Sequence, residues 1–466
     1  MSETEDLELC DRSVTSAKST SAASVIVPTL NSGHDAESAA SALPPVDGGW
    51  RAWSFLVAAT VIVMLIWGLP YSIGVLHVYW TDTLIKGEGG SILTLAATLQ
   101  NGLLYMATAL SGPLFTAFPR WQRALQYCGL LAAVITFISS AFATKPWHIL
   151  VTFGLIYPLS GICYLPCNTL LFEHFFSLRG IATGIVFGGT GLGGASIPFL
   201  MNGLLNKIGY KATMISFGLG YLVIGSIAIV FVRPRIPVSR QQTMEKRKPV
   251  NWSFMKSTPL IIGTITIFLI SLGNFIPSLW LPGKHQPLLW CLPLTNPSAY
   301  ASSLKLTHPS GTGLIAILNA ASVPGNTLLG YLSDHMPVRT VIVISCIGSG
   351  LSCAFLWGFG STDGVLILFA LIFGLLGPSF SAIWTQMIGL ICKDDLISPP
   401  LVVSLFTFVR GVGSLTSGPI SQALLKINNL NGSIGAYGFS NYGVLLIYAS
   451  VTILSGGATG YLFKSS

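Results

Sequence analysis

Apolar runs of about twenty residues recur along almost the whole of this 466-residue chain, and they constrain its fold more than any other feature. A helix of roughly 20 apolar residues is long enough to cross the hydrocarbon layer of a bilayer. The runs cover, within a few residues, 53–79, 91–116, 124–143, 147–171, 180–205, 211–232, 259–281, 311–332, 340–359, 364–390, 401–425 and 441–463. They predict an all-α, multi-pass membrane protein with twelve transmembrane helices.

The composition agrees with a chain whose main solvent is lipid. Only 9% of the residues are charged, whereas soluble domains carry about 25%. The net charge of +8 does not indicate nucleic-acid binding, because the basic residues lie in short loops between the apolar runs. Cys163 and Cys167 lie one helical turn apart without a matching second pair, so we expect no metal site and no cofactor.

The basic residues predict the orientation of the helices. With the N-terminus placed inside, sixteen of the 24 Lys and Arg residues fall in cytoplasmic segments, which favours two cytoplasmic termini. We interpret 1–46 as a disordered cytoplasmic tail, 233–258 as a cytoplasmic linker between bundles at 47–232 and 259–466, and 283–298 as an atypical external insertion. An unspliced short intron is the alternative for 283–298. We expect a plasma-membrane protein that functions as a monomer.

Two loops, one in each predicted bundle, carry similar sequences. Gly112–Arg120 reads GPLFTAFPR, and Gly330–Arg339 reads GYLSDHMPVR. Glycine allows two helices to approach closely, and an acidic residue is stabilised near the positive N-terminal end of a helix. We therefore expect a cytoplasmic gate, with its motif residues at Gly112, Arg120, Gly330, Asp334 and Arg339.

Both loops resemble the G-x-L-x-D-R-x-G-R-R motif of the major facilitator superfamily. The segment Asp47–Trp53 (DGGWRAW) and the span 5 sequence from Arg179 to Pro198 resemble the fungal branch of monocarboxylate-transporter-like carriers. The resemblance covers residues 47–463. It implies two pseudo-symmetric six-helix bundles that rock around a central site, each built of inverted repeats.

The functional residues of that branch are replaced in this chain. Thr116 and Ala117 stand where the first loop of the superfamily has an acid and an Arg. Tyr71 stands where proton-coupled members have a Lys, and Asn319 and Val323 replace an Asp and an Arg of span 8. The resemblance therefore implies the fold without a proton–lactate mechanism.

Arg410 is the outstanding polar residue within the predicted spans. It lies nine residues into span 11, so at 1.5 Å per residue it is about 14 Å deep, and no Asp or Glu lies at a similar depth. An ionisable group at that depth costs roughly 2.5–3.5 kcal/mol and needs a partner or a function. Two hypotheses stay open: Arg410 binds an anionic substrate through its planar fork, or it bonds helix carbonyls and the interface.

Other polar residues near the middle of spans are candidates for the substrate pathway or for interhelical hydrogen bonds. Together with Arg410, the substrate-binding candidates are Tyr71, Asn319, Asn101, Asn168, Asn274, Gln386 and Trp384. His77 is a candidate for proton coupling, with a structural histidine as the alternative. We assign Asn202 and Gln422 to packing. Gly189–Gly194 matches G-x-G-x-x-G, but inside a span its glycines predict close helix crossing.

These observations favour a secondary active or facilitative transporter of a small organic solute, with a monocarboxylate or related organic anion as the first candidate. Its partners would be the solute, with or without a coupled proton, and the lipid bilayer. A vitamin or an aromatic compound is the alternative substrate, and a sensor that has lost transport is the alternative role. A membrane enzyme would require a deep set of catalytic side chains, and a channel would require charge rings. The spans show neither.

Overall fold

The computed structural model describes residues 47–85, 90–235, 255–280, 311–360, 362–392, 399–427, 437 and 442–463. The predicted tail 1–46, most of the linker 233–258 and the insertion 283–298 lie outside these residues. The described α-helices are α2 (Gly49–Tyr79), α3 (Gly90–Ala117), α4 (Gln122–Ser140), α5 (Pro146–Ile149), α6 (Tyr164–Thr169), α7 (Leu171–His174), α8 (Arg179–Phe231), α10 (Thr258–Trp280), α12 (Gly311–His335), α13 (Val338–Leu351), α14 (Asp363–Leu376), α15 (Trp384–Cys392), α16 (Pro399–Leu425) and α17 (Tyr442–Tyr461).

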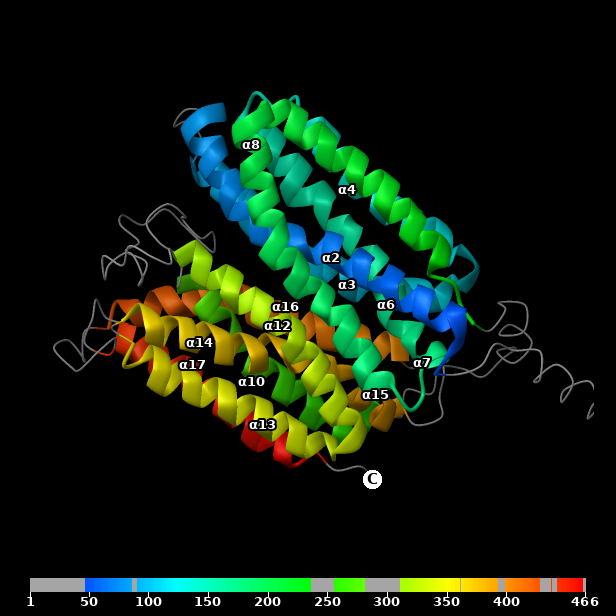
Figure 1. The fold of residues 1–466 in the computed structure, drawn as a ribbon, viewed down its shortest axis with the longest axis vertical. Coiled ribbons are helices and arrows are strands. Elements are labelled where there is room, and N and C mark those ends of the chain that lie inside the picture. The colour runs from blue at the N-terminus through cyan, green and yellow to red at the C-terminus, as the bar shows by residue number, and fades with distance from the viewer. Residues whose placement is uncertain are drawn as a thin grey trace, which may run out of the picture. The chain divides into compact units, whose positions relative to one another are not determined.

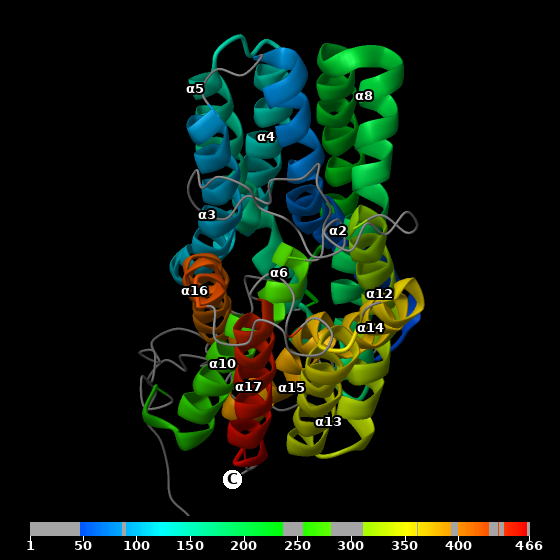
Figure 2. The same ribbon diagram turned by 90° about the vertical axis from the view of Figure 1, so that its left-hand side faces the viewer.

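Helix α8 contains two of the predicted spans. Its 53 residues would form a straight rod of about 80 Å, more than twice the thickness of the hydrocarbon layer. The chain instead reverses at Gly209, which has φ +76°, a conformation that costs glycine little. Figure 2 shows the two antiparallel arms of α8 side by side. Eleven helices in the described residues are long and apolar enough to cross a membrane, and α8 does so twice, which agrees with the predicted twelve spans.

The fourth and tenth spans have the same irregular construction. Each is helical throughout but contains a 3₁₀ segment, η4 (Tyr157–Cys163) and η7 (Pro378–Ile383). Proline lies at the start of both, at Pro158 and Pro378. Because proline has no N–H, it removes one α-helical hydrogen bond at that point. The matching position in the two halves is a local sign of their pseudo-symmetry.

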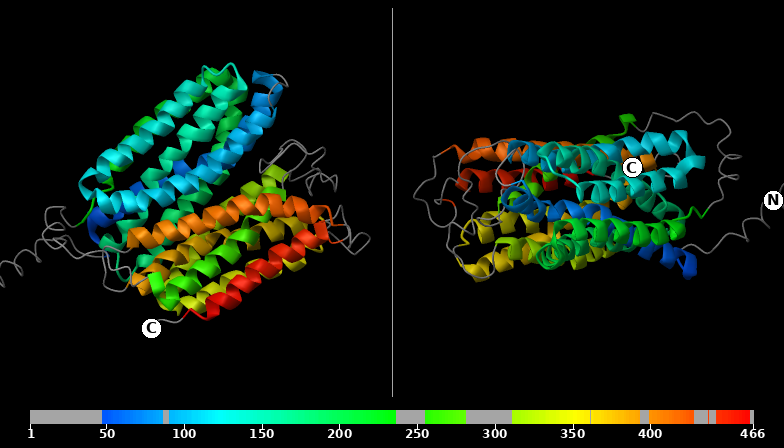
Figure 3. Two further views of the ribbon diagram at one scale, coloured as in Figure 1. Left: turned by 180° about the vertical axis from the view of Figure 1, so that it is seen from behind. Right: turned by 90° about the horizontal axis from the view of Figure 1, so that it is seen from above.

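The spans assemble into two bundles, each with its own apolar core. One bundle contains α2 to α8, with fully buried Trp80, Phe137 and Tyr157. The other contains α10 to α17, with buried Trp357 and Phe369. Figures 1 and 3 show the blue-to-green bundle beside the yellow-to-red one. The two bundles touch along α8 with α12 and along α3 with α16. This is the predicted fold.

The glycines of α8 allow its two close approaches. Gly184 and Gly191 lie against the backbone of α12, where Asn326 and Asn319 leave no room for a Cβ. Gly189 and Gly193 lie against the backbone of α2, at Thr60 and Gly68. The G-x-G-x-x-G sequence therefore serves helix packing, as its position within a span predicts.

Candidate functional site

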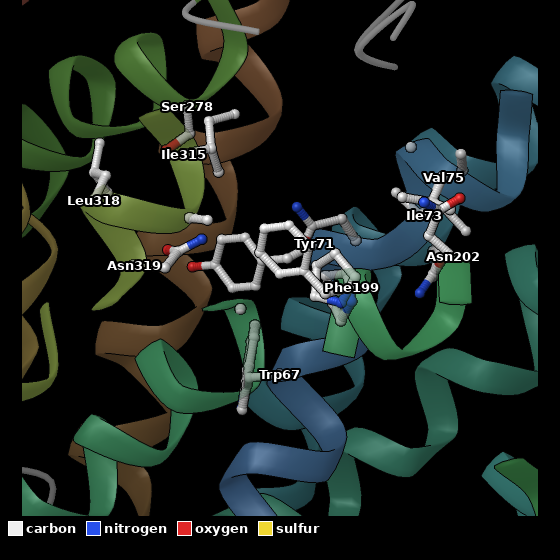
Figure 4. Close-up of a pocket in the computed structure, with 18 of the residues that line it drawn as sticks. Trp67, Tyr71, Ile73, Val75, Phe199, Asn202, Ser278, Ile315, Leu318 and Asn319 are labelled. Carbon is white, nitrogen blue, oxygen red and sulfur yellow. The ribbon is translucent and has the colours of Figure 1, made fainter. Parts of the chain in front are cut away.

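A cavity of about 510 Å³ lies between the two bundles. Its lining comes from α2, α3 and α8 of one bundle and from α10, α12 and α16 of the other. We call the end of the helices that carries Asp47, Arg179 and Asp334 the inner end, which the sequence predicts to be cytoplasmic. The cavity extends away from it, past Thr83 and Asn206, towards the outer end. Figure 4 shows Tyr71 and Phe199 facing Asn319 across it.

Five of the predicted substrate-binding residues line this cavity, and three do not. The lining contains Arg410, Tyr71, Asn319, Asn101 and Asn274. The remaining candidates, Asn168, Trp384 and Gln386, are absent from the lining. Asn168 is buried in α6, within the first bundle. The structure thus gathers residues from both bundles that lie more than 300 positions apart in the sequence.

Arg410 lies at the inner end of the cavity between two aromatic rings. Its guanidinium carbon is 5.4 Å from the centroid of Phe275 and 5.6 Å from that of Trp384. Such cation–π contacts stabilise a cation by about 2 kcal/mol where water is excluded. The lining residues include no Asp or Glu. Because Trp384 contacts Arg410 but does not line the cavity, it lies behind the cavity surface.

Buried amides add polar groups to the lining. Gln100 is fully buried, and the structure gives neither atom of its amide a hydrogen-bond partner. The Asn274 amide nitrogen donates to the carbonyl of Gly377 at 2.9 Å, which leaves its oxygen without a partner. The amide nitrogen of Asn319 also lacks one. A buried amide without a partner is costly, so these groups are suited to bind a solute or water.

Tyr71 and Asn319 meet across Gly194. A Cβ on Gly194 would lie 2.9 Å from the Tyr71 ring and 2.9 Å from the Asn319 amide nitrogen. Tyr71 comes from α2 and Asn319 from α12, so this glycine brings polar groups of both bundles together. The lack of a side chain at Gly194 therefore leaves the space that Tyr71 and Asn319 occupy.

Sequence reasoning misassigned or missed several lining residues. Asn202, which we assigned to packing, lines the cavity, because it lies on the cavity face of α8 near the outer end. The missed residues include Gln100, Trp67, Tyr105, Phe199 and Phe275. Gln100 and Tyr105 share the face of α3 that carries Asn101 and Ala97, and this spacing of three to four residues was the available signal.

His77 lies on α2 but not on the cavity surface. It is buried, and its Nε2 lies 3.4 Å from the hydroxyl of Thr94 on α3. The neighbouring Val78 and Tyr79 do line the cavity. His77, the candidate for proton coupling, therefore lies behind the residues that line the cavity. Among the described residues, no group of three or more His, Cys, Asp and Glu side chains could hold a metal ion.

At the inner end, Asp334 joins the two bundles. Its carboxylate accepts the backbone N–H of Gly180 at 2.6 Å and that of Ile181 at 2.9 Å, in the first turn of α8. It also accepts the side-chain amide of Gln386. These N–H groups have no partner within the helix, and the helix dipole favours an anion here. Gln386 therefore belongs to the inner contact and not to the cavity.

Close helix contacts accompany this ion–dipole contact. Gly330 and Gly180 lie backbone to backbone, and the hydroxyls of Thr183 and Thr385 are 2.6 Å apart. At the related loop, Gly112 lies against the backbone oxygen of Pro400.

The two arginines of the predicted gate motif lie apart from these contacts. The Arg339 guanidinium lies 5.9 Å from the ring centroid of Tyr461, within its own bundle. Arg120 lies in an exposed turn, η2 (Pro119–Trp121).

Asp47 anchors the start of the described chain to the same region. Its carboxylate accepts the backbone N–H groups of Phe176, Ser177 and Leu178 at 2.7 to 3.2 Å and the Ser177 hydroxyl at 3.0 Å. Burial alone would raise the pKa of Asp47, but these hydrogen bonds outweigh it and lower the pKa below its ordinary value. Asp47 therefore fixes the turn from which α8 begins.

Comparison with known proteins agrees with this architecture. The sequence profile described as "Major Facilitator Superfamily" matches residues 120–290. This match and the relatives below support the placement of the chain in the major facilitator superfamily. Its narrower likeness to monocarboxylate-transporter-like carriers stays a prediction.

Several fungal transporter and efflux proteins are similar to this chain over most of their length. The "MFS-type transporter pynF" of Aspergillus niger is 24% identical over 89% of this chain and 90% of its own. The "Aspyridones efflux protein apdF" of Emericella nidulans is 23% identical over 82% of this chain and 74% of its own. The "Fujikurins efflux protein" of Gibberella fujikuroi is 24% identical over 88% and 83%.

The similarity to this superfamily and the long apolar helices together support an integral, multi-pass membrane protein of a transporter family.

Proposed function

We propose that this protein moves an organic anion across the membrane by alternating access, with the acid group of the substrate on Arg410. Arg410 supports this because it is the only charged side chain among the cavity-lining residues that the structure describes. Its planar guanidinium suits bidentate binding of a carboxylate. An anion there would compensate a positive charge that lies between two aromatic rings.

The contacts of Asp334 support alternating access as the mechanism. In this state the bundles touch at the inner end, while the cavity extends towards the outer end. We infer that the inner end is cytoplasmic, so that this is the state that exchanges solute with the outside. The opposite state would separate Asp334 from α8 and expose the cavity to the cytoplasm.

Export is the direction that we propose. Two of the relatives carry names as efflux proteins, one for aspyridones and one for fujikurins. In an exporter, the state described here would release the solute. Because the cavity lining contains no carboxylate and no histidine, we expect movement down the substrate gradient, or coupling through protonation of the substrate itself.

Transport into vesicles containing the purified protein tests this proposal. A panel of labelled carboxylates, vitamins and aromatic compounds would be assayed with and without a proton gradient. For anionic substrates, we expect Arg410→Gln to reduce uptake by roughly 10- to 100-fold, since a hydrogen bond to a charged group is worth about 1.5–3 kcal/mol. Arg410→Lys should retain more activity, because it keeps the charge.

A matched control variant is Lys211→Gln. Lys211 also lies over an aromatic ring, 4.5 Å from the centroid of Phe142, but it is not part of the cavity lining. Its substitution should leave uptake unchanged. If Arg410→Gln transports anions at the normal rate, the proposed role of Arg410 is wrong. If the protein transports none of the panel while a neutral solute still binds, a sensor becomes the better hypothesis.

A further inference from the structure

Four aromatic side chains of the first bundle form a chain of ring contacts near the inner end of the cavity. The Trp67 ring lies 4.6 Å from Tyr105 and 5.5 Å from Tyr164, between centroids. The Tyr164 ring in turn lies 6.1 Å from Phe187. These residues come from α2, α3, α6 and α8, so the chain of contacts crosses the whole bundle.

Arg410 completes this chain in the second bundle. Its guanidinium contacts Phe275 of α10 on one side and Trp384 of α15 on the other. Phe275 contacts Tyr105 at 6.3 Å, and Trp384 contacts Phe187 at 6.2 Å. Both of these ring contacts are between the bundles. The seven residues therefore form a closed circuit, which we call the aromatic belt.

The aromatic belt lies between the cavity and the inner contacts. Arg410 and Phe275 line the cavity, whereas Trp384 does not. Trp384 immediately precedes Thr385, whose hydroxyl meets Thr183 of the other bundle, and Gln386 donates to Asp334. A solute that passed from the cavity to the inner end would have to cross the belt.

We infer that the aromatic belt closes the inner end of the cavity and that Arg410 is its substrate-sensitive element. This inference rests on the proposed function. Arg410 braces Phe275 and Trp384, the two rings through which the second bundle contacts Tyr105 and Phe187. A carboxylate competes for the guanidinium with charge-assisted, directional hydrogen bonds, which are stronger than contacts with a ring face. Binding of the anion therefore loosens both contacts between the bundles.

The same geometry defines the class of substrate. When the guanidinium turns towards a carboxylate, the face of Phe275, which lines the cavity, loses its cover. An acid with a planar, apolar body can cover this ring by stacking, whereas a short aliphatic acid cannot. A cavity of about 510 Å³ also has room for such a body. The belt thus favours planar aromatic or conjugated acids over acetate-sized ones.

Disulfide trapping measures this coupling. In the double variant Thr183→Cys with Thr385→Cys, the two thiols lie across the bundle interface, so the rate of cross-linking reports closure of the inner end. A protease site introduced into residues 236–254 would separate the bundles unless they are cross-linked. The probes are 2-naphthoate, its neutral methyl ester and acetate. We expect naphthoate to slow cross-linking at least threefold, and the ester and acetate to have no effect.

Variants of the belt separate closure from binding. Trp384→Leu removes the contact with Phe187 but leaves the Arg410 charge, so naphthoate should bind without changing the cross-linking rate. Phe187→Leu removes the same contact from the other bundle and should behave alike, which guards against a folding defect in either variant. Phe406→Leu is the matched control, because Phe406 contacts Trp384 at 5.9 Å from outside the belt. It should respond as the parent does.

The outcomes distinguish a failure of the inference about the aromatic belt from a failure of the proposed function. If naphthoate is transported but cross-linking is the same with and without it, the belt is not the closing element, and the proposed function stands. If short acids are transported and naphthoate neither binds nor moves, the inference on substrate class is wrong. If Arg410→Gln has no effect on uptake of any acid, the proposed function itself fails.

Discussion

The carboxylate of Asp334, near the end of α12, accepts the backbone N–H of Gly180 in the first turn of α8, 2.6 Å away. These two residues belong to different bundles. The carboxylate on α12 therefore caps the N-terminus of α8. The N-cap residue of α8 itself makes no side-chain cap hydrogen bond. Any motion that separates the bundles at this end must return both groups to water.

We expect Asp334→Asn to destabilise the inner contact. An asparagine oxygen can accept one of the two N–H groups, but its NH₂ group cannot accept the other. The loss should be about 1–2 kcal/mol, because hydrogen bonds to charged groups are worth more than neutral ones. In a two-state equilibrium this would lower the ratio of closed to open inner end by roughly 5- to 30-fold. Cross-linking of cysteines at positions 183 and 385 measures the change.

Asp363→Asn is the control for that measurement. Asp363 lies in the first turn of α14, at the opposite end of the second bundle. Its substitution should leave the cross-linking rate unchanged. Equal rates in the parent and in Asp334→Asn would contradict the assigned role of Asp334.

Two adjacent glycines of α8 should respond differently to a methyl group. In Gly194→Ala the new Cβ meets the side chains of Tyr71 and Asn319, which can move, so substrate affinity should fall while the fold is kept. In Gly193→Ala it meets the backbone of Gly68 at 2.8 Å, which cannot move cheaply. We expect that variant to lose about 1–3 kcal/mol of stability by overpacking. Thermal unfolding in detergent and substrate binding would be measured for both variants, and the reverse pattern would contradict the packing described here.

Gln100→Met should have opposite effects on stability and on transport. The change keeps a similar volume and removes a buried amide that has no partner, so the free energy of unfolding should rise slightly, by up to about 1 kcal/mol. Uptake of the substrate should fall about tenfold, because one hydrogen bond to the solute is lost. Denaturation and uptake by the same preparation measure both. A stabilised variant with full activity would show that Gln100 does not contact the solute.

The anchor at Asp47 predicts a dependence of stability on pH. The pKa of this carboxyl is lowered in the folded protein, so its contribution is complete above the unfolded-state pKa, near 3.9, and is lost as the pH falls through the folded-state pKa. The parent should therefore be more stable than Asp47→Asn at neutral pH, and the difference should shrink below about pH 4. Ser177→Ala removes only one donor and should cost less. A difference that is independent of pH would contradict this account.

The sequence predicts the spans better than it predicts which way their side chains face. Hydropathy places span 9 at 340–359, and the structure has α13 and its π-helical extension at Val338–Trp357. In a membrane the lipid-facing side of a helix is apolar as well, so the usual contrast between an apolar and a polar face is lost. The choice of Asn101 without its neighbour Gln100 reflects this limit.

The inner contacts show a second limit. The sequence places Trp384 and Gln386 near the middle of a span, which suggests the cavity, but in the structure Trp384 contacts Arg410 and Gln386 donates to Asp334. Their roles depend on which residues of the other bundle lie opposite, and this tertiary information is absent from local sequence patterns. From the motif loop, the sequence predicts a close helix approach at Gly330 and an acid near a helix N-terminus at Asp334, because both are local requirements.

The glycines along α8 affect how the two bundles can move relative to each other. Where Gly180, Gly184 and Gly191 face α12, α8 has no side chain, and its backbone lies against the backbone oxygens of Gly330, Asn326 and Asn319. Separation of the two helices at these points therefore requires no α8 side chain to change its rotamer. Resistance to rocking is then concentrated in a few polar and aromatic contacts, each of which a solute or a single substitution can adjust.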